Sequence, residues 1–340
     1  MAPYLMPAEG APQDRVWMAF PCEGYSLGDT DQARHEARST WAAVAHAVAQ
    51  FEPVTMLVDP AELAVAKRYI SQGIELIEAP LNDAWMRDIG PTFVHVDDGS
   101  VAAVDWTFNG WGAQDWARWD RDAEIGAMVG ELAGVAVVPS ALVNEGGGIQ
   151  TDGHGTVLVT ETVQLDPHRN PDATKVGVEA ELARTIGATD VVWLPYGLTR
   201  DSQRYGTRGH VDIVAAMPAP GRLLLHTQRD ESHPDSLVCK RIRSVVDGAF
   251  DIVEMPAPAT LTDADGYVDY SYINHLVVNG GVIACAFDDP HDADARAILA
   301  EQYPGREVVA VDARPLFERG GGIHCITQQQ PSPLRKEAVA

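Results

Sequence analysis

The chain is poor in positive charge. It carries 25 lysine and arginine residues against 49 aspartate and glutamate residues, which gives a formal net charge of −24 at pH 7. Because such an acidic surface repels nucleic acid and anionic membranes, we expect neither as a partner. The charge is compatible with a small cationic ligand, although an acidic surface can also serve solubility alone.

Cysteine is scarce, and long apolar runs are absent. The four cysteines, Cys22, Cys239, Cys285 and Cys325, are far apart and form no CxxC or Cys/His spacing, so we expect neither disulfides nor a metal site. The first fifteen residues lack the basic and apolar regions of a signal peptide, and no apolar run is long enough to span a membrane. A reducing cytoplasm is the expected location.

The chain also lacks low-complexity segments and a proline- or serine-rich linker. We therefore expect one domain over residues 1–331, followed by a flexible tail over residues 332–340. Short β-type runs alternate with amphipathic runs, which indicates an α/β fold. Strands are predicted at residues 54–59, 74–79, 101–108, 156–165, 190–195, 211–217, 222–227, 250–255, 275–287 and 307–313. Helices are predicted at roughly residues 31–50, 60–72, 115–134, 171–187, 234–247 and 291–303.

A loose repeat runs through the chain. Five segments share a small or glycine-bearing turn, a polar residue that could do chemistry and then a strand; these polar residues are Asp88, Glu145, His210, Asn274 and Cys325. The steps of 57, 65, 64 and 51 residues leave room for one helix and two more strands, which predicts five ββαβ units. In a closed ring of such units Asp88, Glu145, His210 and Cys325 would converge on the axis. The alternative is an ordinary α/β sheet with coincidental spacing.

Cys325 is the candidate nucleophile. It follows three glycines at residues 320–322 and stands next to His324. A free cysteine is more often a small buried hydrophobe, and that is our interpretation of the other three cysteines. At Cys325 the glycines leave room for a substrate, which favours a reactive thiol. The reactive thiolate would need a nearby base or cation.

His210 is the candidate partner of that thiol. In the stretch from Gly209 to Asp212, strand alternation would place the side chains of His210 and Asp212 on the same face. A histidine and a carboxylate so placed can form an acid/base and cation-binding pair. Most His-x-Asp pairs are structural, so this motif alone is a weak signal.

Two further carboxylates lie next to glycine-containing turns, which leave space around them. Asp88 lies between Trp85 and a Gly-Pro turn, and Glu145 precedes three glycines. We expect Trp85 to form one wall of a pocket and Arg87 to hold the loop through ion pairs. Paired carboxylates suit the planar fork of a guanidinium cation. A thiol nucleophile then implies attack at the guanidinium carbon. The histidine would give a proton to the departing ammonia and afterwards activate water.

These motifs together resemble the agmatine deiminase (agmatine iminohydrolase) family of the guanidino-modifying, or pentein, superfamily. The resemblance extends from residue 6 to residue 331 and is carried by residues 82–88 (NDAWMRD), 108–112 (FNGWG), 145–149 (EGGGI), 209–212 (GHVD) and 322–331 (GIHCITQQQP). It implies a five-bladed α/β propeller, the pentein fold, with the active site at its centre. It also implies hydrolysis of agmatine to N-carbamoylputrescine and ammonia through a covalent thiouronium intermediate, without a cofactor.

The resemblance assigns roles to individual residues. It implies that Cys325 is the nucleophile, that His210 is the general acid and base, and that Asp88 and Asp212 bind the guanidinium group. Glu145 lies at the family's Glu-Gly-Gly motif and would line the substrate site, as would Trp85. The partner implied is a small cationic guanidino substrate, and a homo-oligomer such as a dimer is compatible with the sequence.

Some positions depart from the family pattern. Residues 201–208 and Ile213 differ from the family's stretch around Gly-His-Val-Asp, and Gly10 replaces a tryptophan after Glu9. These positions lie near where the far end of the substrate would sit, so guanidine hydrolysis is more firmly indicated than agmatine itself. Arg204 and Arg208 would either disfavour an amine there or pair with local acids such as Asp201, and the acidic surface favours pairing.

Three alternatives stay open from the sequence. The first is a deiminase of arginine, peptidyl-arginine or another guanidino acid. The second is an amidinotransferase, which shares the thiouronium intermediate but passes the amidine to an amine. The third is an inactive binding protein for polyamines or guanidines, against which the complete set of thiol, histidine and carboxylates argues.

Overall fold

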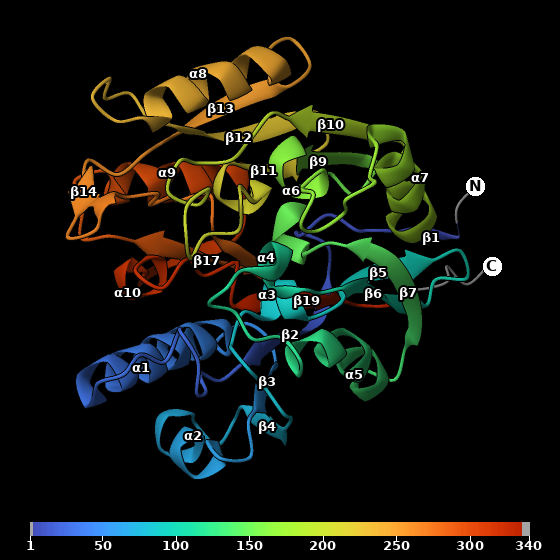
Figure 1. Cartoon of the computed structure of the whole chain (residues 1–340), viewed down its shortest axis with the longest axis vertical. Coiled ribbons are helices and arrows are strands. Elements are labelled where there is room, and N and C mark those ends of the chain that lie inside the picture. The colour runs from blue at the N-terminus through green and yellow to red at the C-terminus, as the bar shows by residue number, and fades with distance from the viewer. Residues whose placement is uncertain (1–2, 335–340) are drawn as a thin grey trace.

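The computed structural model describes residues 3–334, which form a mixed α/β fold (Figure 1). The strands are β1 (Tyr4–Leu5), β2 (Gln13–Ala19), β3 (Val54–Val58), β4 (Glu75–Glu78), β5 (Thr92–Val96), β6 (Val101–Thr107), β7 (Ala136–Val143), β8 (Gln150–Thr151), β9 (Thr156–Thr160), β10 (Asp190–Leu194), β11 (Ala215–Ala219), β12 (Arg222–Thr227), β13 (Asp251–Pro256), β14 (Thr262–Asp263), β15 (Gly266–Tyr267), β16 (Leu276–Val278), β17 (Gly281–Ala286), β18 (Glu307–Asp312) and β19 (Thr327–Pro331). The helices are α1 (Asp31–Val48), α2 (Leu63–Tyr69), α3 (Met86–Ile89), α4 (Gly110–Ala113), α5 (Ile125–Leu132), α6 (Glu161–Gln164), α7 (Lys175–Ile186), α8 (Asp235–Val246), α9 (Asp292–Gln302) and α10 (Arg314–Phe317), with 3₁₀ turns η1 (Asp122–Glu124), η2 (Gly146–Gly148) and η3 (Val211–Ile213).

Five sheets share one connection pattern. In each, a first strand pairs antiparallel with a second, a helix follows, and a third strand pairs parallel with the second. The four sheets within the chain are β5–β6–α5–β7, β8–β9–α7–β10, β11–β12–α8–β13 and β16–β17–α9–β18. In the fifth, β19 near the C-terminus pairs with β2, and α1 and β3 follow. The ββαβ unit predicted from the repeat is therefore present in each sheet.

The central strands are apolar because both of their faces are covered. All five residues of β3 are buried, as expected for a parallel strand that lies inside its sheet. The helices begin and end at recognisable signals: Thr30 accepts a hydrogen bond from Ala33 N at the start of α1, and Gly187 closes α7 with a φ of 72°. Within residues 3–334 no helix is both long and apolar enough to cross a bilayer.

Several predicted elements have different bounds in the structure. The segment 275–287 is a hairpin of β16 and β17 rather than one strand, because Asn279-Gly280 makes the turn, with Gly280 at a φ of 76°. The predicted strand 156–165 ends at Thr160, whose hydroxyl donates to Gly209 O, and α6 follows. Of the predicted helix 115–134, only η1 and α5 are helical. Residues 332–334 hydrogen-bond to Pro12 and Gly99, and residues 335–340 of the predicted tail lie outside the described residues.

The arrangement of the sheets positions the candidate residues. In every sheet the candidate residue stands just before the first strand: Asp88 before β5, Glu145 before β8, His210 before β11, Asn274 before β16 and Cys325 before β19. In Figure 1 the long helices α1, α5, α7 and α8 lie toward the outside, whereas α3 and β19 lie near the middle. The turns that carry the candidate residues therefore belong to the inner part of the molecule.

Candidate active site

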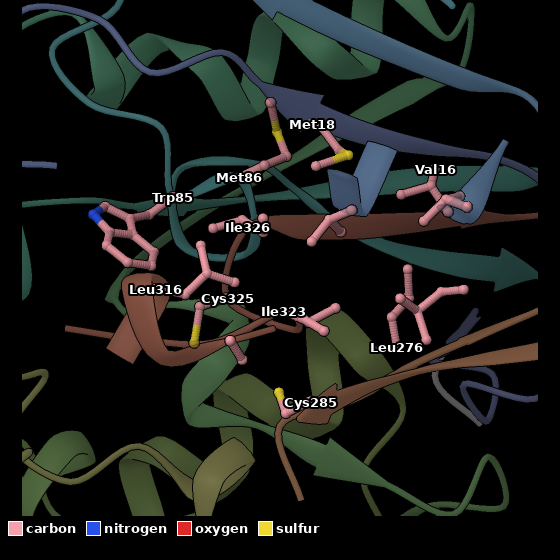
Figure 2. Packing of buried hydrophobic residues seen from close by; sticks show 14 of the residues in the cluster. Val16, Met18, Trp85, Met86, Leu276, Cys285, Leu316, Ile323, Cys325 and Ile326 are labelled. Atoms are coloured by element: carbon pink, nitrogen blue, oxygen red, sulfur yellow. The ribbon is translucent and has the colours of Figure 1, made fainter. Parts of the chain in front are cut away.

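Cys325 lies in the turn between α10 and β19 and is only 5% exposed. Ile323 and Ile326, which flank it in the sequence, pack in the apolar core, and Figure 2 shows Trp85 beside the cysteine. Asn274 Nδ2 donates to the sulfur at 3.3 Å, and the Asp212 Oδ2 atom accepts from it at 3.5 Å. The cysteine is thus held between an amide and a carboxylate.

The three glycines before Cys325 have two roles: they leave space beside the thiol and they allow close packing of the turn. A Cβ atom at Gly321 would lie 2.8 Å from Trp85 and 3.0 Å from the Cys325 sulfur, so this glycine does leave space beside the thiol. Gly320 has a φ of +106°, and a Cβ atom at Gly322 would lie 2.4 Å from the Asn274 side chain. Two of the three glycines therefore serve the turn and its packing rather than substrate access.

The electrostatic setting of Cys325 differs from the sequence-based expectation. Burial, together with the carboxylates of Asp212 and Asp88, raises the pKa of the thiol well above its usual range. Within residues 3–334, the hydrogen-bond partners of the sulfur are Asn274 and Asp212, and His210 is not among them. The expected activation of the thiol by a neighbouring histidine is therefore absent from this state, in which the group is a neutral thiol.

His210 does not lie on a strand, as the alternation argument assumed. It stands immediately before η3, which contains Asp212, so the two side chains are placed by a tight 3₁₀ turn. The backbone N–H of His210 donates to Asp201 Oδ2 at 2.9 Å and to Thr207 Oγ1 at 2.9 Å. These polar contacts of the preceding loop compete with strand formation and fix the position of the histidine.

The His210 ring lies between two carboxylates. Its Nε2 atom is 3.2 Å from Glu145 Oε2, and its Nδ1 atom faces Asp88 Oδ1 at 3.8 Å. Burial favours the neutral ring, but Asp88 and Glu145 outweigh it and raise the pKa of His210 to about 9. The ring is an imidazolium at neutral pH, and its Nδ1 atom has no hydrogen-bond partner among the described residues. A proton donor therefore faces the interior of the site.

Asp88 is fixed from two sides. Trp111 Nε1 donates to its Oδ2 atom at 2.8 Å, and Gly147 N donates to its Oδ1 atom at 3.1 Å. Burial raises the pKa of Asp88 to about 6, although His210 works in the opposite direction. The carboxylate is therefore ionised at neutral pH, close to the point at which it takes up a proton.

Three of the candidate side chains converge on the backbone at Gly147. A Cβ atom at this position would lie 2.5 Å from His210 Nδ1, 2.9 Å from Asp88 Oδ1 and 3.1 Å from Asp212 Oδ2. These contacts are too close for any side chain, so the glycine is required by the convergence itself. The structure thus brings together Asp88, His210 and Asp212, with Cys325 in contact with Asp212.

Glu145 lies behind His210 rather than on the pocket wall. It is fully buried and forms an ion pair with Arg169, whose Nε atom is 2.9 Å from Glu145 Oε1. Arg169 also pairs with Asp166 at 3.0 Å and donates to Thr207 O. Burial opposes ionisation of Glu145, but Arg169 and His210 outweigh it and lower the pKa of the carboxyl group. A buried, ionised Glu145 stabilises the charged His210 ring.

His324 and Glu9 were not among the predicted site residues. His324 is 2% exposed and bridges two carboxylates, with Nδ1 at 2.8 Å from Asp212 Oδ2 and Nε2 at 2.7 Å from Glu9 Oε1. Burial and Arg87 oppose its protonation, but Glu9 and Asp212 raise its pKa overall. Burial favours protonation of Asp212, but the His324 ring, which holds this carboxyl group in place, helps to outweigh burial and to lower the pKa of Asp212. The only sequence signal for His324 was its position next to Cys325.

Trp85 and three other aromatic residues enclose a narrow pocket above Cys325. Its wall also includes Asp88, Thr207 and Arg319, and its aromatic members are Trp85, Trp111, Trp116 and Tyr205. Trp85 is therefore part of the wall of this pocket. These aromatic faces suit a flat cation and an alkyl chain.

The arginines near the site have different partners from those expected. Arg87 is buried and donates to His324 O at 3.3 Å and Gln329 Oε1 at 2.7 Å, so it holds the loop through neutral oxygens rather than ion pairs. Arg204 pairs with Asp115 at 3.4 Å and not with Asp201. Asp201 is occupied by Thr207 and His210, because its carboxylate accepts their backbone N–H groups.

The comparisons with known proteins agree with this geometry. The family model of the Porphyromonas-type peptidyl-arginine deiminases matches residues 5–331. The chain belongs to this family. A protein of Streptomyces coelicolor, named provisionally as an agmatine deiminase, is 52% identical over 96% of this chain and 99% of its own length. An agmatine deiminase of Pseudomonas putida is 40% identical over 98% of this chain and 97% of its own length. The family resemblance of the sequence is thereby confirmed.

Solved structures of the family have the same fold. The agmatine deiminase of Enterococcus faecalis superposes with a TM-score of 0.90 at 30% identity, covering 98% of this chain and 97% of that one. An agmatine deiminase of C. jejuni with substrate bound has a TM-score of 0.88 at 21% identity, covering 98% of this chain and 97% of that one. The second likeness concerns the fold alone.

Proposed function

We propose that the protein hydrolyses the guanidino group of agmatine, giving N-carbamoylputrescine and ammonia, with Cys325 as the nucleophile. The observation that carries this proposal is the convergence of Asp88, Asp212 and the His210 imidazolium beside the thiol. Two carboxylates match a guanidinium cation, the sulfur supplies the nucleophile and the imidazolium supplies a proton. The agmatine deiminases among the relatives support the choice of substrate.

Binding of the substrate cation favours ionisation of the neutral Cys325 thiol. Asp88 and Asp212 are the main reasons, after burial, why the thiol of Cys325 resists ionisation. A guanidinium group bound between these carboxylates neutralises them and places positive charge beside the sulfur. Both effects lower the pKa of the thiol, since nearby positive charge favours a thiolate. The Cys325 thiol therefore releases its proton to solvent when the substrate binds, and the thiolate forms beside the bound guanidinium group.

The chemistry then proceeds in two displacements. The Cys325 thiolate adds to the guanidinium carbon, a proton from His210 goes to one terminal nitrogen, and the carbon–nitrogen bond breaks to release ammonia. This leaves a thiouronium group on the sulfur. His210, now neutral, takes a proton from a water molecule that adds to the same carbon. The carbon–sulfur bond then breaks, which frees the ureido product and the thiol. A reducing cytoplasm, which keeps the thiol available, suits this mechanism.

The other site residues hold these groups in place. We assign Glu145 to stabilising the His210 imidazolium, because its Oε2 atom lies 3.2 Å from His210 Nε2. We assign His324 to orienting Asp212, because its Nδ1 atom lies 2.8 Å from Asp212 Oδ2. Asn274 donates to the sulfur and would stabilise its thiolate. Trp85 forms the wall against which the substrate lies.

We further propose that the five sheets are the blades of a five-bladed propeller around this site. The common ββαβ connection supports the arrangement, as does the pairing of β19 with β2, which joins the two ends of the chain in one blade. Contacts among turns from all five sheets support it as well. Gly147 donates to Asp88, and hydrogen bonds link Asp212, Asn274 and Cys325. The backbone N–H of Arg87, next to Asp88, donates to Cys325 O at 3.0 Å and joins the two groups.

A substrate screen with a cysteine variant tests the proposed function. Ammonia release is measured with agmatine, arginine, 4-guanidinobutyrate and a peptidyl-arginine. We expect agmatine to have the highest kcat/KM, and Cys325→Ala to lower it by at least about a thousandfold, because the nucleophile is lost. Cys239→Ala, at a buried cysteine on α8, is the control and keeps the activity. Preference for another guanidino compound would change the substrate assignment, and an active Cys325→Ala enzyme would refute the mechanism.

A further inference from the structure

A second hollow lies next to the pocket above Cys325. We call it the outer recess; its walls include Tyr25, Asp265, Asp269 and Glu318. Tyr205, Gly206 and Gly320 line both the outer recess and the pocket above Cys325. The two hollows are therefore neighbours that share these three wall residues.

The free charge of the outer recess is negative. Its two arginines already have carboxylate partners: Arg200 pairs with Asp263 at 2.5 Å and lies 3.9 Å from Asp265, and Arg204 pairs with Asp115 at 3.4 Å. Among residues 3–334, Asp269 has no carboxylate-neutralising partner of this kind. The outer recess therefore offers a carboxylate, and not a free cation, to a molecule that enters it.

Asp269 is the deepest acid of the outer recess and is only 8% exposed. Over residues 3–334, no other residue donates a hydrogen bond to its carboxylate, and no cationic side chain lies within ion-pair distance. Burial, and after it Asp201, raises the pKa of Asp269 to about 7, although Arg200 works in the opposite direction. A buried carboxylate without a partner is costly in free energy, and a bound cation would relieve that cost.

An aromatic row connects the two hollows. The rings of Trp111 and Trp116 stack at 5.4 Å, Trp116 lies 5.5 Å from Tyr205, and Tyr205 stacks on Tyr25 at 4.3 Å. Trp111 donates to Asp88 at the inner end, and Tyr25 lies in the outer recess. Such aromatic faces suit the methylene groups of an alkyl chain, and they also tolerate a cationic group at either end of that chain.

We propose that Asp269 forms a second cation subsite, which binds the terminal ammonium group of a guanidinoalkylamine whose guanidinium group lies at Cys325. This inference rests on the proposed function, because it extends the same substrate site outward. The enzyme would then distinguish substrates by the group at the end opposite the guanidinium. A guanidino acid would bring its carboxylate toward Asp269, and the resulting repulsion would weaken its binding.

Asp269→Asn tests the subsite, because it removes the charge and keeps the shape. Steady-state kinetics compare agmatine with butylguanidine, which has the same chain length and no amine. We expect the variant to lower kcat/KM for agmatine by about tenfold or more, through KM, since a charged contact is lost. Butylguanidine should be hydrolysed equally well by both enzymes. Asp190→Asn, an exposed surface aspartate at the start of β10, controls for the change in net charge and should affect neither substrate.

A second set of measurements separates a structural defect from a lost subsite. Because Asp269 is buried without a partner, the variant should keep or raise the melting temperature at pH 8. The wild type alone gives a further test, because its kcat/KM for agmatine should exceed its kcat/KM for butylguanidine by about tenfold or more. An equal loss for both substrates, or wild-type enzyme that does not distinguish them, would overturn the subsite.

Calorimetric titration of Cys325→Ala distinguishes failure of the subsite from failure of the proposed function. Agmatine should bind this variant at least about tenfold more tightly than the Cys325→Ala/Asp269→Asn double variant, whereas butylguanidine should bind both equally. If the wild type released no ammonia from any guanidino compound, the proposed function would fail and the titration would still decide the subsite. Equal binding of agmatine to both variants would exclude a role for Asp269.

Discussion

At the scale of single residues, the site depends on which carboxylates and histidines carry charge. Asp88 must be ionised to bind a guanidinium group, and burial raises its pKa to about 6. His210 must be protonated to assist the departure of ammonia, and its flanking carboxylates outweigh burial and raise its pKa to about 9. The free enzyme is thus competent between these two values.

The resulting pH dependence is a testable prediction. The kcat/KM for butylguanidine, which carries no amine for Asp269, should fall below about pH 6, where Asp88 takes up a proton, and above about pH 9, where His210 loses one. Because the two groups interact, the two limbs report the pair rather than either residue alone. The measurement is a pH profile from about pH 5 to 10 in constant ionic strength. A profile that rises without limit toward alkaline pH would mean that thiol ionisation alone controls the rate.

His324→Gln tests the orienting role of the histidine beside Cys325. The hydrogen bond from His324 opposes the effect of burial and holds the pKa of Asp212 down, so its loss should raise that pKa. The acid limb of the kcat/KM profile should then move to higher pH, and kcat should fall by roughly tenfold or more. His226→Gln, at another buried histidine that contacts Ser271, should leave the limb in place. An unchanged acid limb in His324→Gln would show that Asp212 does not depend on this contact.

At the scale of elements, the turn before each first strand determines the geometry of the site. Gly147 in η2 is the clearest case, because a Cβ atom would meet His210, Asp88 and Asp212 at once. Gly147→Ala should therefore lower kcat by about a hundredfold or more, since displaced catalytic groups lose much of their effect. Gly73→Ala is the matched control, as a Cβ atom there has nothing within 4 Å. If both variants had the same activity, the convergence at Gly147 would not be catalytically relevant.

The same elements show what sequence patterns could and could not predict. Five small or glycine-bearing turns in front of strands predicted the ββαβ units, because turn chemistry and side-chain periodicity are local properties. The pattern failed at His210, where Asp201 and Thr207 hold the backbone in a 3₁₀ turn through contacts up to nine residues away. It also missed the contact of His324 with Glu9, since the two residues are 315 positions apart. Only the folded chain brings such groups together.

At the scale of the whole molecule, β19 near the C-terminus pairs with β2 near the N-terminus. Trp17 on β2 donates from Nε1 to Gln330 Oε1 on β19 at 2.9 Å, and both residues are buried. Trp17→Phe leaves the glutamine oxygen without this donor, so the free energy of unfolding should fall by about 2 kcal/mol. Urea denaturation measures the loss. The double variant with Gln330→Met should recover part of it, and an additive double variant would show that the two side chains do not interact across this pair of strands.

The central claim is that Cys325 carries the guanidino carbon during the reaction. Rapid acid quenching during turnover of agmatine, followed by mass spectrometry of the intact protein and its peptides, tests it directly. The account predicts an adduct with the mass of agmatine less ammonia on the peptide that contains Cys325, and no adduct in Cys325→Ala. Turnover without any adduct on this peptide, together with activity in Cys325→Ala, would contradict it.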